Sequence, residues 1–215
     1  MCSGRVDPVM MAEAFINGAD GVFVGACLPG ECHYTSGNFQ AMSKIKMMQK
    51  LLQHADVNPE RLVMKMMSSA EGAKFVSFVT DFQNKIRELG KIGTSENISE
   101  SNLPIKLAAV KAVLSGKKVR WVMGKRLEFL EKGNLYGEVF TEHEIHRLFE
   151  EVALDELTIQ EILLRTKERP LTISVLAETL KLPTKQILRR LVDLRRIGLV
   201  QIKGIENNSP LWIAI

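Results

Sequence analysis

The chain has 215 residues, 46% of them hydrophobic and 25% charged. This composition excludes a collagen-like or disordered protein, and the length fits two small domains. The apolar runs are far shorter than the roughly 18–20 residues of a membrane span, and no secretory signal pattern opens the chain, so we expect a cytoplasmic protein with no membrane partner. The formal net charge is +4, and residues 155–215 carry ten Lys and Arg against seven Asp and Glu.

Residues 1–90 alternate between helical and strand patterns. We expect helices from Asp7, from Asn38 as the capping residue and over residues 69–89, with strands at residues 21–25 and 62–64. This alternation with short connections predicts an α/β domain in which helices flank a small parallel sheet. Two strands make a marginal sheet, so we expect one or two further strands from a preceding segment or a partner chain.

The rest of the chain has two other patterns. Residues 91–102 are rich in Gly, Ser, Thr and Asn and are predicted to be a linker. Residues 103–154 are predicted to form a helical connector. Residues 155–215 predict three short helices, the first over residues 157–166, followed by two strands. That order is typical of a winged helix–turn–helix domain.

All three cysteines lie in the first 32 residues. Their odd number, without an export signal, argues against a disulfide framework. Cys27 and Cys32 leave a strand on a loop that can turn both sulfurs toward one point. Cys2 is expected on the same side of the sheet, where open α/β proteins build their sites. Clustered thiolates favour a metal ion or an iron–sulfur cluster, while redox thiols and buried structural cysteines stay open as alternatives.

The histidines give a weaker signal. His33 follows Cys32 and could supply a nitrogen ligand, as in Rieske-type clusters. Adjacent residues seldom reach the same metal, so we place His33 beside the cluster rather than on it. His143 and His146 are one turn apart on a predicted helix with flanking glutamates, which favours a solvated helix face. We find no catalytic triad or carboxylate pair and expect no independent active site.

The basic C-terminal helix offers a second candidate surface. Lys185, Gln186, Arg189 and Arg190 lie on its early turns, the part that meets DNA in a DNA-reading winged helix. A basic helix is also an ordinary solvated face or a protein-docking face. Lys203 is the only basic residue of the two final strands. Because DNA affinity scales with the phosphates neutralised, protein docking is favoured over nucleic acid.

The cysteine-bearing motifs carry a family resemblance. They comprise residues 2–8 (CSGRVDP), residues 18–22 (GADGV), residues 27–34 (C-x-P-G-x-C-H-Y), Gly37-Asn38, residues 59–61 (PER) and residues 70–75 (AEG-x-x-F). Over residues 1 to about 90, the chain resembles the delta, iron–sulfur subunit of methyl-viologen-reducing hydrogenase.

The resemblance implies a domain over residues 1–90 that holds one 2Fe–2S cluster, with Cys2, Cys27 and Cys32 as metal ligands. It also implies electron transfer from hydrogenase or formate dehydrogenase subunits to a heterodisulfide-reductase-type flavoprotein subunit, in an anaerobic complex. Family members begin with a further strand and cysteine motif, so we expect an incomplete ligand set in this chain. The alternative function is a redox-responsive regulator that binds DNA through its winged helix.

Overall fold

The computed structural model describes residues 2–215, which divide into a first compact unit ending at Leu154 and a second unit, Asp155–Ile215. Within the described residues, no helix is long and apolar enough to cross a membrane. The first unit begins with a short 3-10 turn, η1 (Ser3–Arg5), and contains a second, η2 (Pro59–Arg61).

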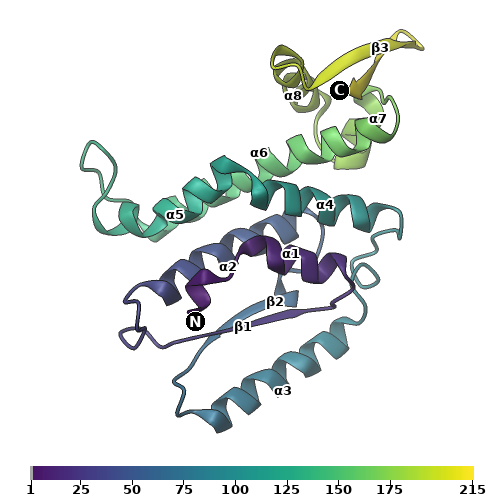
Figure 1. Cartoon of the computed structure of the whole chain (residues 1–215). Coiled ribbons are helices and arrows are strands. Elements are labelled where there is room, and N and C mark those ends of the chain that lie inside the picture. The colour runs from purple at the N-terminus through teal and green to yellow at the C-terminus, as the bar shows by residue number, and fades with distance from the viewer. Residues whose placement is uncertain (1) are drawn as a thin grey trace. The chain divides into compact units, whose positions relative to one another are not determined.

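The first unit is built around a small parallel sheet. β1 (Val22–Ala26) pairs in parallel with β2 (Leu62–Met66), in a register that sets Val22 opposite Leu62 and Ala26 opposite Met66. α1 (Pro8–Ile16) and α2 (Gly37–His54) lie on one face of the sheet, and α3 (Gly72–Leu89) lies on the other (Figure 1). The predicted α/β arrangement with a small parallel sheet and flanking helices is therefore confirmed.

The helix starts follow local capping chemistry, with one correction. The Asp7 carboxylate accepts a hydrogen bond from the Val9 amide at 3.0 Å, and Pro8 occupies the first position of α1, as predicted. The prediction that Asn38 caps α2 is wrong, because Ser36 is the N-cap residue. Asn38 is fully buried inside the first turn, where its side chain is used for a long-range contact described below.

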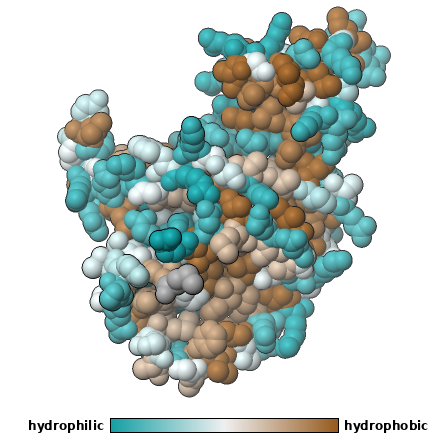
Figure 2. Space-filling model, in the orientation of Figure 1, coloured by the Kyte–Doolittle hydropathy of each residue, from teal (hydrophilic) through white to brown (hydrophobic). Residues whose placement is uncertain are grey.

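α3 is an amphipathic helix with none of its residues buried. It contacts the sheet through aromatic rings: the Phe23 ring centroid lies 6.3 Å from that of Phe75 and 5.8 Å from that of Phe82. Phe75 nevertheless stays 49% exposed. Apolar surface is visible over β1 and α3 (Figure 2). Apolar side chains of α3 thus remain accessible beside the two described strands.

The segment expected to be a linker is packed against the first ninety residues. The Ile92 side chain is buried, and its amide donates to Asp20 at 2.8 Å. Glu96 pairs with Arg61, whose Nε lies 2.6 Å from the Glu96 carboxylate. The Arg61 side chain is completely buried and also donates to Ser95 Oγ and to the carbonyls of Asp20, Leu89, Gly90 and Lys91. A buried guanidinium needs such partners, and the polar segment supplies several of them.

Three more helices follow: α4 (Asn102–Ser115), α5 (Lys117–Glu131) and α6 (Glu142–Glu168). Leu107, Val110 and Leu114 of α4 are buried, as their spacing predicts. α4 packs against α1, and α5 packs against α2. α6 contributes residues to both units. The separate helix expected over residues 157–166 is the later part of α6, since no Gly or Pro interrupts the sequence from residue 142 to residue 168.

The second unit contains two short helices and a hairpin after α6. α7 (Ile173–Leu180) and α8 (Thr184–Arg196) precede β3 (Val200–Glu206) and β4 (Ser209–Ala214), which pair antiparallel. The core side chains are Ile162, Leu171, Leu176, Ala177, Ile187, Leu191, Leu194, Val200 and Trp212. The two later helices and the strand pair lie where the sequence predicts them.

Candidate functional site

Two of the three cysteines converge. Cys2 Sγ and Cys32 Sγ lie 3.8 Å apart, although the residues are 30 positions apart in the chain. This distance is too long for a disulfide, in which the sulfurs are about 2.05 Å apart. Two thiolates bound at about 2.3 Å to one tetrahedral metal ion would be separated by roughly 3.8 Å. The sulfur pair therefore has the spacing of two adjacent ligands on one metal ion.

Cys2 is positioned by η1 and by a lysine from α2. The Gly4 amide donates to Cys2 Sγ at 3.4 Å, so Cys2 caps the turn with its own side chain. Lys44 Nζ donates to the carbonyl oxygens of Gly4 and Val6, at 2.6 Å and 3.0 Å. Burial lowers the pKa of Lys44, and the nearby Asp7 carboxylate opposes this shift without cancelling it.

Cys32 lies against the N-terminus of α2, where backbone amides point at its sulfur. Burial of the thiol raises the pKa of Cys32. This effect is outweighed by hydrogen bonds from the amides of Tyr34, Asn38 and Gly37 and from the Cys2 thiol. The pKa of Cys32 therefore lies below its ordinary value. Unpaired amides and the helix dipole both favour a negative charge at such a place. These surroundings therefore favour the thiolate form of Cys32.

Gly37 provides the space in which the two sulfurs meet. A Cβ atom placed on Gly37 would overlap Cys2 Sγ and would lie 3.1 Å from Cys32 Sγ. A Cβ atom on Gly4 would lie 2.7 Å from the Gly37 carbonyl oxygen. The backbone of η1 and the first turn of α2 can approach this closely because both residues lack side chains.

The third cysteine is not brought to the pair. Cys27 is exposed, and His33 is exposed with its ring against Tyr34. Asn38 Nδ2 donates to the carbonyls of Cys27 and Leu28, at 3.2 Å and 3.1 Å, and so ties this loop to α2. Over residues 2–215, no group of three or more His, Cys, Asp and Glu side chains is placed to hold a metal ion.

Sequence reasoning missed Gly37, Gly4 and Lys44 as parts of this site. Both glycines lie inside the cysteine-bearing motifs, so their presence beside cysteines was a usable signal. Lys44 had no such signal, because it resembles the other lysines of a long helix.

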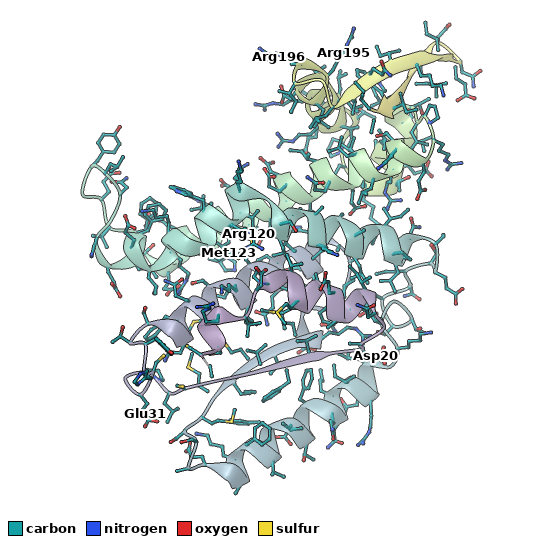
Figure 3. All side chains as sticks on the ribbon, viewed as in Figure 1. Asp20, Glu31, Arg120, Met123, Arg195 and Arg196 are labelled. Carbon is teal, nitrogen blue, oxygen red and sulfur yellow. The ribbon has the colours of Figure 1, made fainter. Side chains whose placement is uncertain are left out.

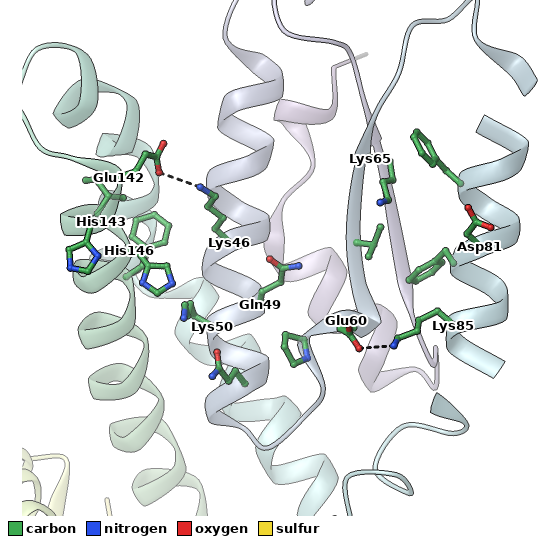
Figure 4. A pocket seen from close by; sticks show the side chains of 17 residues that line it. Lys46, Gln49, Lys50, Glu60, Lys65, Asp81, Lys85, Glu142, His143 and His146 are labelled. Carbon is green, nitrogen blue, oxygen red and sulfur yellow. Dashed lines mark hydrogen bonds and ion pairs between the residues drawn. The ribbon is translucent and has the colours of Figure 1, made fainter. Parts of the chain in front are cut away.

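A hollow of about 940 Å³ lies elsewhere in the first unit, among α2, β2, α3 and the start of α6 (Figure 4). Four of its charged side chains form two ion pairs: Lys46 lies 3.3 Å from Glu142, and Lys85 lies 3.0 Å from Glu60. His143 and His146 line it and are exposed, as expected for a solvated helix face. This internal pairing makes it a weaker candidate than the cysteine site.

α8 presents a mixed surface in the second unit. Lys185, Gln186 and Arg189 are exposed, whereas Arg190 forms an ion pair with Asp155. Leu188 is 44% exposed and Val192 is 43% exposed, so apolar side chains lie among the cations. Arg195 and Arg196 follow at the end of the helix (Figure 3).

The cysteine-bearing segment also matches known proteins. Residues 1–90 match the family of the methyl-viologen-reducing hydrogenase delta subunit. Over 97 residues, the chain is 39% identical to the vhc iron-sulfur subunit of the F420-non-reducing hydrogenase of Methanococcus voltae, covering 45% of this chain and 67% of that protein. The chain belongs to the methyl-viologen-reducing hydrogenase delta subunit family.

Two further relatives place this delta-subunit segment in different contexts. The iron-sulfur subunit of the F420-non-reducing hydrogenase of Archaeoglobus profundus is 47% identical over 89 residues, which are 41% of this chain and 65% of that protein. A subunit of the Ferredoxin:CoB-CoM heterodisulfide reductase of Methanosarcina mazei is 38% identical over 94 residues, which are 44% of this chain and 12% of that protein. The chain spans about two thirds of the length of the hydrogenase subunits that it matches.

Proposed function

We propose that this chain is an iron–sulfur electron-transfer subunit of an anaerobic, cytoplasmic oxidoreductase complex. The observation that carries the proposal is the Cys2–Cys32 sulfur pair, 3.8 Å apart in the space left by Gly37. The names of the hydrogenase relatives, which are iron-sulfur subunits, support iron as the metal. When bound, a cluster supplies one-electron transfer, and the protein binds and tunes it.

We assign the pair to one iron of a 2Fe–2S cluster. Such a cluster takes four thiolates, so two further ligands are needed. Cys27 is the third proposed ligand because it lies on the same loop as Cys32, and the remaining thiolate comes from another polypeptide segment. The amides at the N-terminus of α2 stabilise the anionic sulfur of Cys32, which favours the reduced, more negative state of a cluster.

The proposed partners are hydrogenase or formate dehydrogenase subunits on the donor side and a heterodisulfide-reductase-type flavoprotein subunit on the acceptor side. The match to the heterodisulfide reductase relative supports the acceptor, because that polypeptide contains a segment that is 38% identical to 94 residues of this chain. Domains that occur within one chain work at short distance from each other.

Anaerobic reconstitution of the full chain tests the cofactor. We expect iron and acid-labile sulfide to bind together and to give an EPR signal on reduction, and Cys2→Ser and Cys32→Ser to lose both. Cys27→Ser tests the third ligand. Iron without sulfide would indicate a mononuclear site, and no iron at all would contradict the proposal.

For the second unit, we propose a winged-helix module that docks to a protein of the complex. The supporting observation is the exposure of Leu188 and Val192 among the α8 cations, since apolar side chains gain nothing against a phosphate backbone. Because Arg190 forms an ion pair with Asp155, its charge is less available for contact with a DNA phosphate.

The alternative, a redox-responsive DNA-binding regulator, is tested directly. It requires salt-dependent binding to duplex DNA that Arg189→Ala weakens and that Arg147→Ala, a change at an exposed arginine of α6, leaves unchanged. We expect no such binding at physiological salt.

A further inference from the structure

Lys44 is tied to the cysteine site without being part of any cysteine motif. It lies seven residues after Gly37 on α2, so both residues face the same side of the helix, toward η1. Gly37 leaves space for the sulfurs, and Lys44 contacts the peptide carbonyls of the turn that carries Cys2. One helix face therefore provides both the space for Cys2 and a contact that holds its backbone.

The lysine contacts are specific. Lys44 Nζ lies 2.6 Å from the Gly4 oxygen and 3.0 Å from the Val6 oxygen, the two carbonyls on either side of Arg5. Charge-assisted hydrogen bonds of this kind are about twice as strong as neutral ones. Because the Gly4 amide in turn donates to Cys2 Sγ, the contacts fix the turn at the residue that orients the sulfur.

An ion pair holds the other end of the turn. Arg120 of α5 donates to both carboxylate oxygens of Asp7, each at 2.9 Å. Asp7 is also the N-cap of α1 and contributes to the electrostatic environment of Lys44. The segment after Cys2 is thus fixed by Lys44 at Gly4 and Val6 and by Arg120 at Asp7.

We propose that Lys44 is the positioning residue that holds Cys2 against Cys32, by clamping the two carbonyls of the turn that carries Cys2. Where the site binds a cluster, Lys44 also places a positive charge beside one ligand. This second consequence rests on the proposed function, whereas the clamp does not.

Iron-free protein tests the clamp. Phenylarsine oxide condenses with two convergent thiols, forming two As–S bonds and releasing one water molecule, with no change in oxidation state. We would titrate the reduced full chain with this probe and compare Lys44→Met, Lys44→Arg and Lys46→Met. Lys46 is the matched control, because it lies on the same helix but its amine is exposed and pairs with Glu142.

We expect Lys44→Met to weaken arsenical binding about tenfold, as expected for the loss of strong hydrogen bonds. Lys44→Arg should recover most of the affinity, and Lys46→Met should match the parent. Thermal unfolding of each variant identifies a global loss of structure. Parent-like binding by a folded Lys44→Met variant would overturn the proposal, as would tight binding by Cys2→Ser.

A second readout uses the reconstituted protein. Removing a positive charge beside an anionic cluster should move its midpoint potential to a more negative value in Lys44→Met but not in Lys44→Arg. A parent that binds the arsenical but forms no cluster would contradict the iron–sulfur function, and the clamp would still be decided by the arsenical affinity of Lys44→Met. A cluster whose potential is equal in both variants would overturn the electrostatic role.

Discussion

The cysteine site and the α8 surface each depend on one helix, but in opposite ways. On α2, the residues that matter face inward: Gly37 admits two sulfurs, and Lys44 contacts backbone carbonyls. On α8, Lys185 and Arg189 face solvent, whereas Arg190 forms an ion pair with Asp155. The cysteine site on α2 depends on close steric fit, because one added methyl group at Gly37 would overlap a sulfur atom. The α8 surface depends on charge and exposed area, so single changes there should have small effects on folding.

The strongest test of this contrast is Gly37→Ala. The added methyl group would overlap Cys2 Sγ, so the sulfurs must separate, and we expect arsenical or iron affinity to fall about 100-fold. Gly72→Ala is the matched control, because a Cβ atom at this first residue of α3 meets nothing within 4 Å. Equal losses in both variants would show that the steric account is wrong.

Arg61→Met tests whether the cysteine-bearing unit depends on its buried guanidinium. The change leaves Glu96 and several carbonyls without their donor, and we expect a loss of about 3–5 kcal/mol in the free energy of unfolding. Urea denaturation measures it. Arg87→Met, at an exposed position where the guanidinium donates to the Asn84 side chain, should cost less than about 0.5 kcal/mol.

In the second unit, substitutions in the buried core should lower the free energy of unfolding more than substitutions on the exposed face of α8. Leu191→Ala removes a fully buried side chain and should cost about 2–5 kcal/mol. Leu188→Ala, three residues earlier on α8 and 44% exposed, should cost less than about 1 kcal/mol. Tryptophan fluorescence can follow unfolding here, since Trp212 lies in this core. Similar costs at the two positions would contradict the assignment of the exposed face.

A smaller effect is expected from pH. Burial raises the pKa of Glu96, but Arg61 and the Asn58 amide lower it more, so its pKa in the folded protein lies below the ordinary value of 4.5. The ionised Glu96 carboxylate therefore contributes fully to the free energy of unfolding above pH 4.5. This contribution is lost as the pH falls through the pKa of Glu96 in the folded protein. Urea denaturation at a series of pH values measures this effect. Below pH 4.5, the free energy of unfolding should depend less on pH in Glu96→Gln than in the parent, whereas Glu100→Gln, at an exposed position, should match the parent.

Local patterns predicted the elements well, because capping and periodicity are local. Asp7 and Pro8 start α1 as expected, and the strand pattern at residues 62–64 marks β2. Asn38 shows the limit: its type predicts a cap, but it instead donates to carbonyls 10 and 11 residues away. Propensity alone cannot tell a local hydrogen bond from a distant one.

The site was predictable in part for the same reason. Clustering of cysteines predicted a shared site, and two of the three do meet. The partners of Arg61 and the role of Lys44 depend on contacts across 35 and 40 positions, which no short-range pattern encodes. The same contacts explain why a Gly- and Ser-rich segment expected to be a linker is packed.

The separation of Cys2 and Cys32 along the chain has a consequence for biogenesis. Between them lie α1 and β1, so the thiols become neighbours only after these elements have docked and α2 has begun. In an unfolded chain, Cys2 and Cys32 are joined by a long flexible loop, whose closure opposes the binding of one metal ion by both thiols. Maturation should therefore follow folding, and a delivery system would need to act on a chain that already has its native backbone.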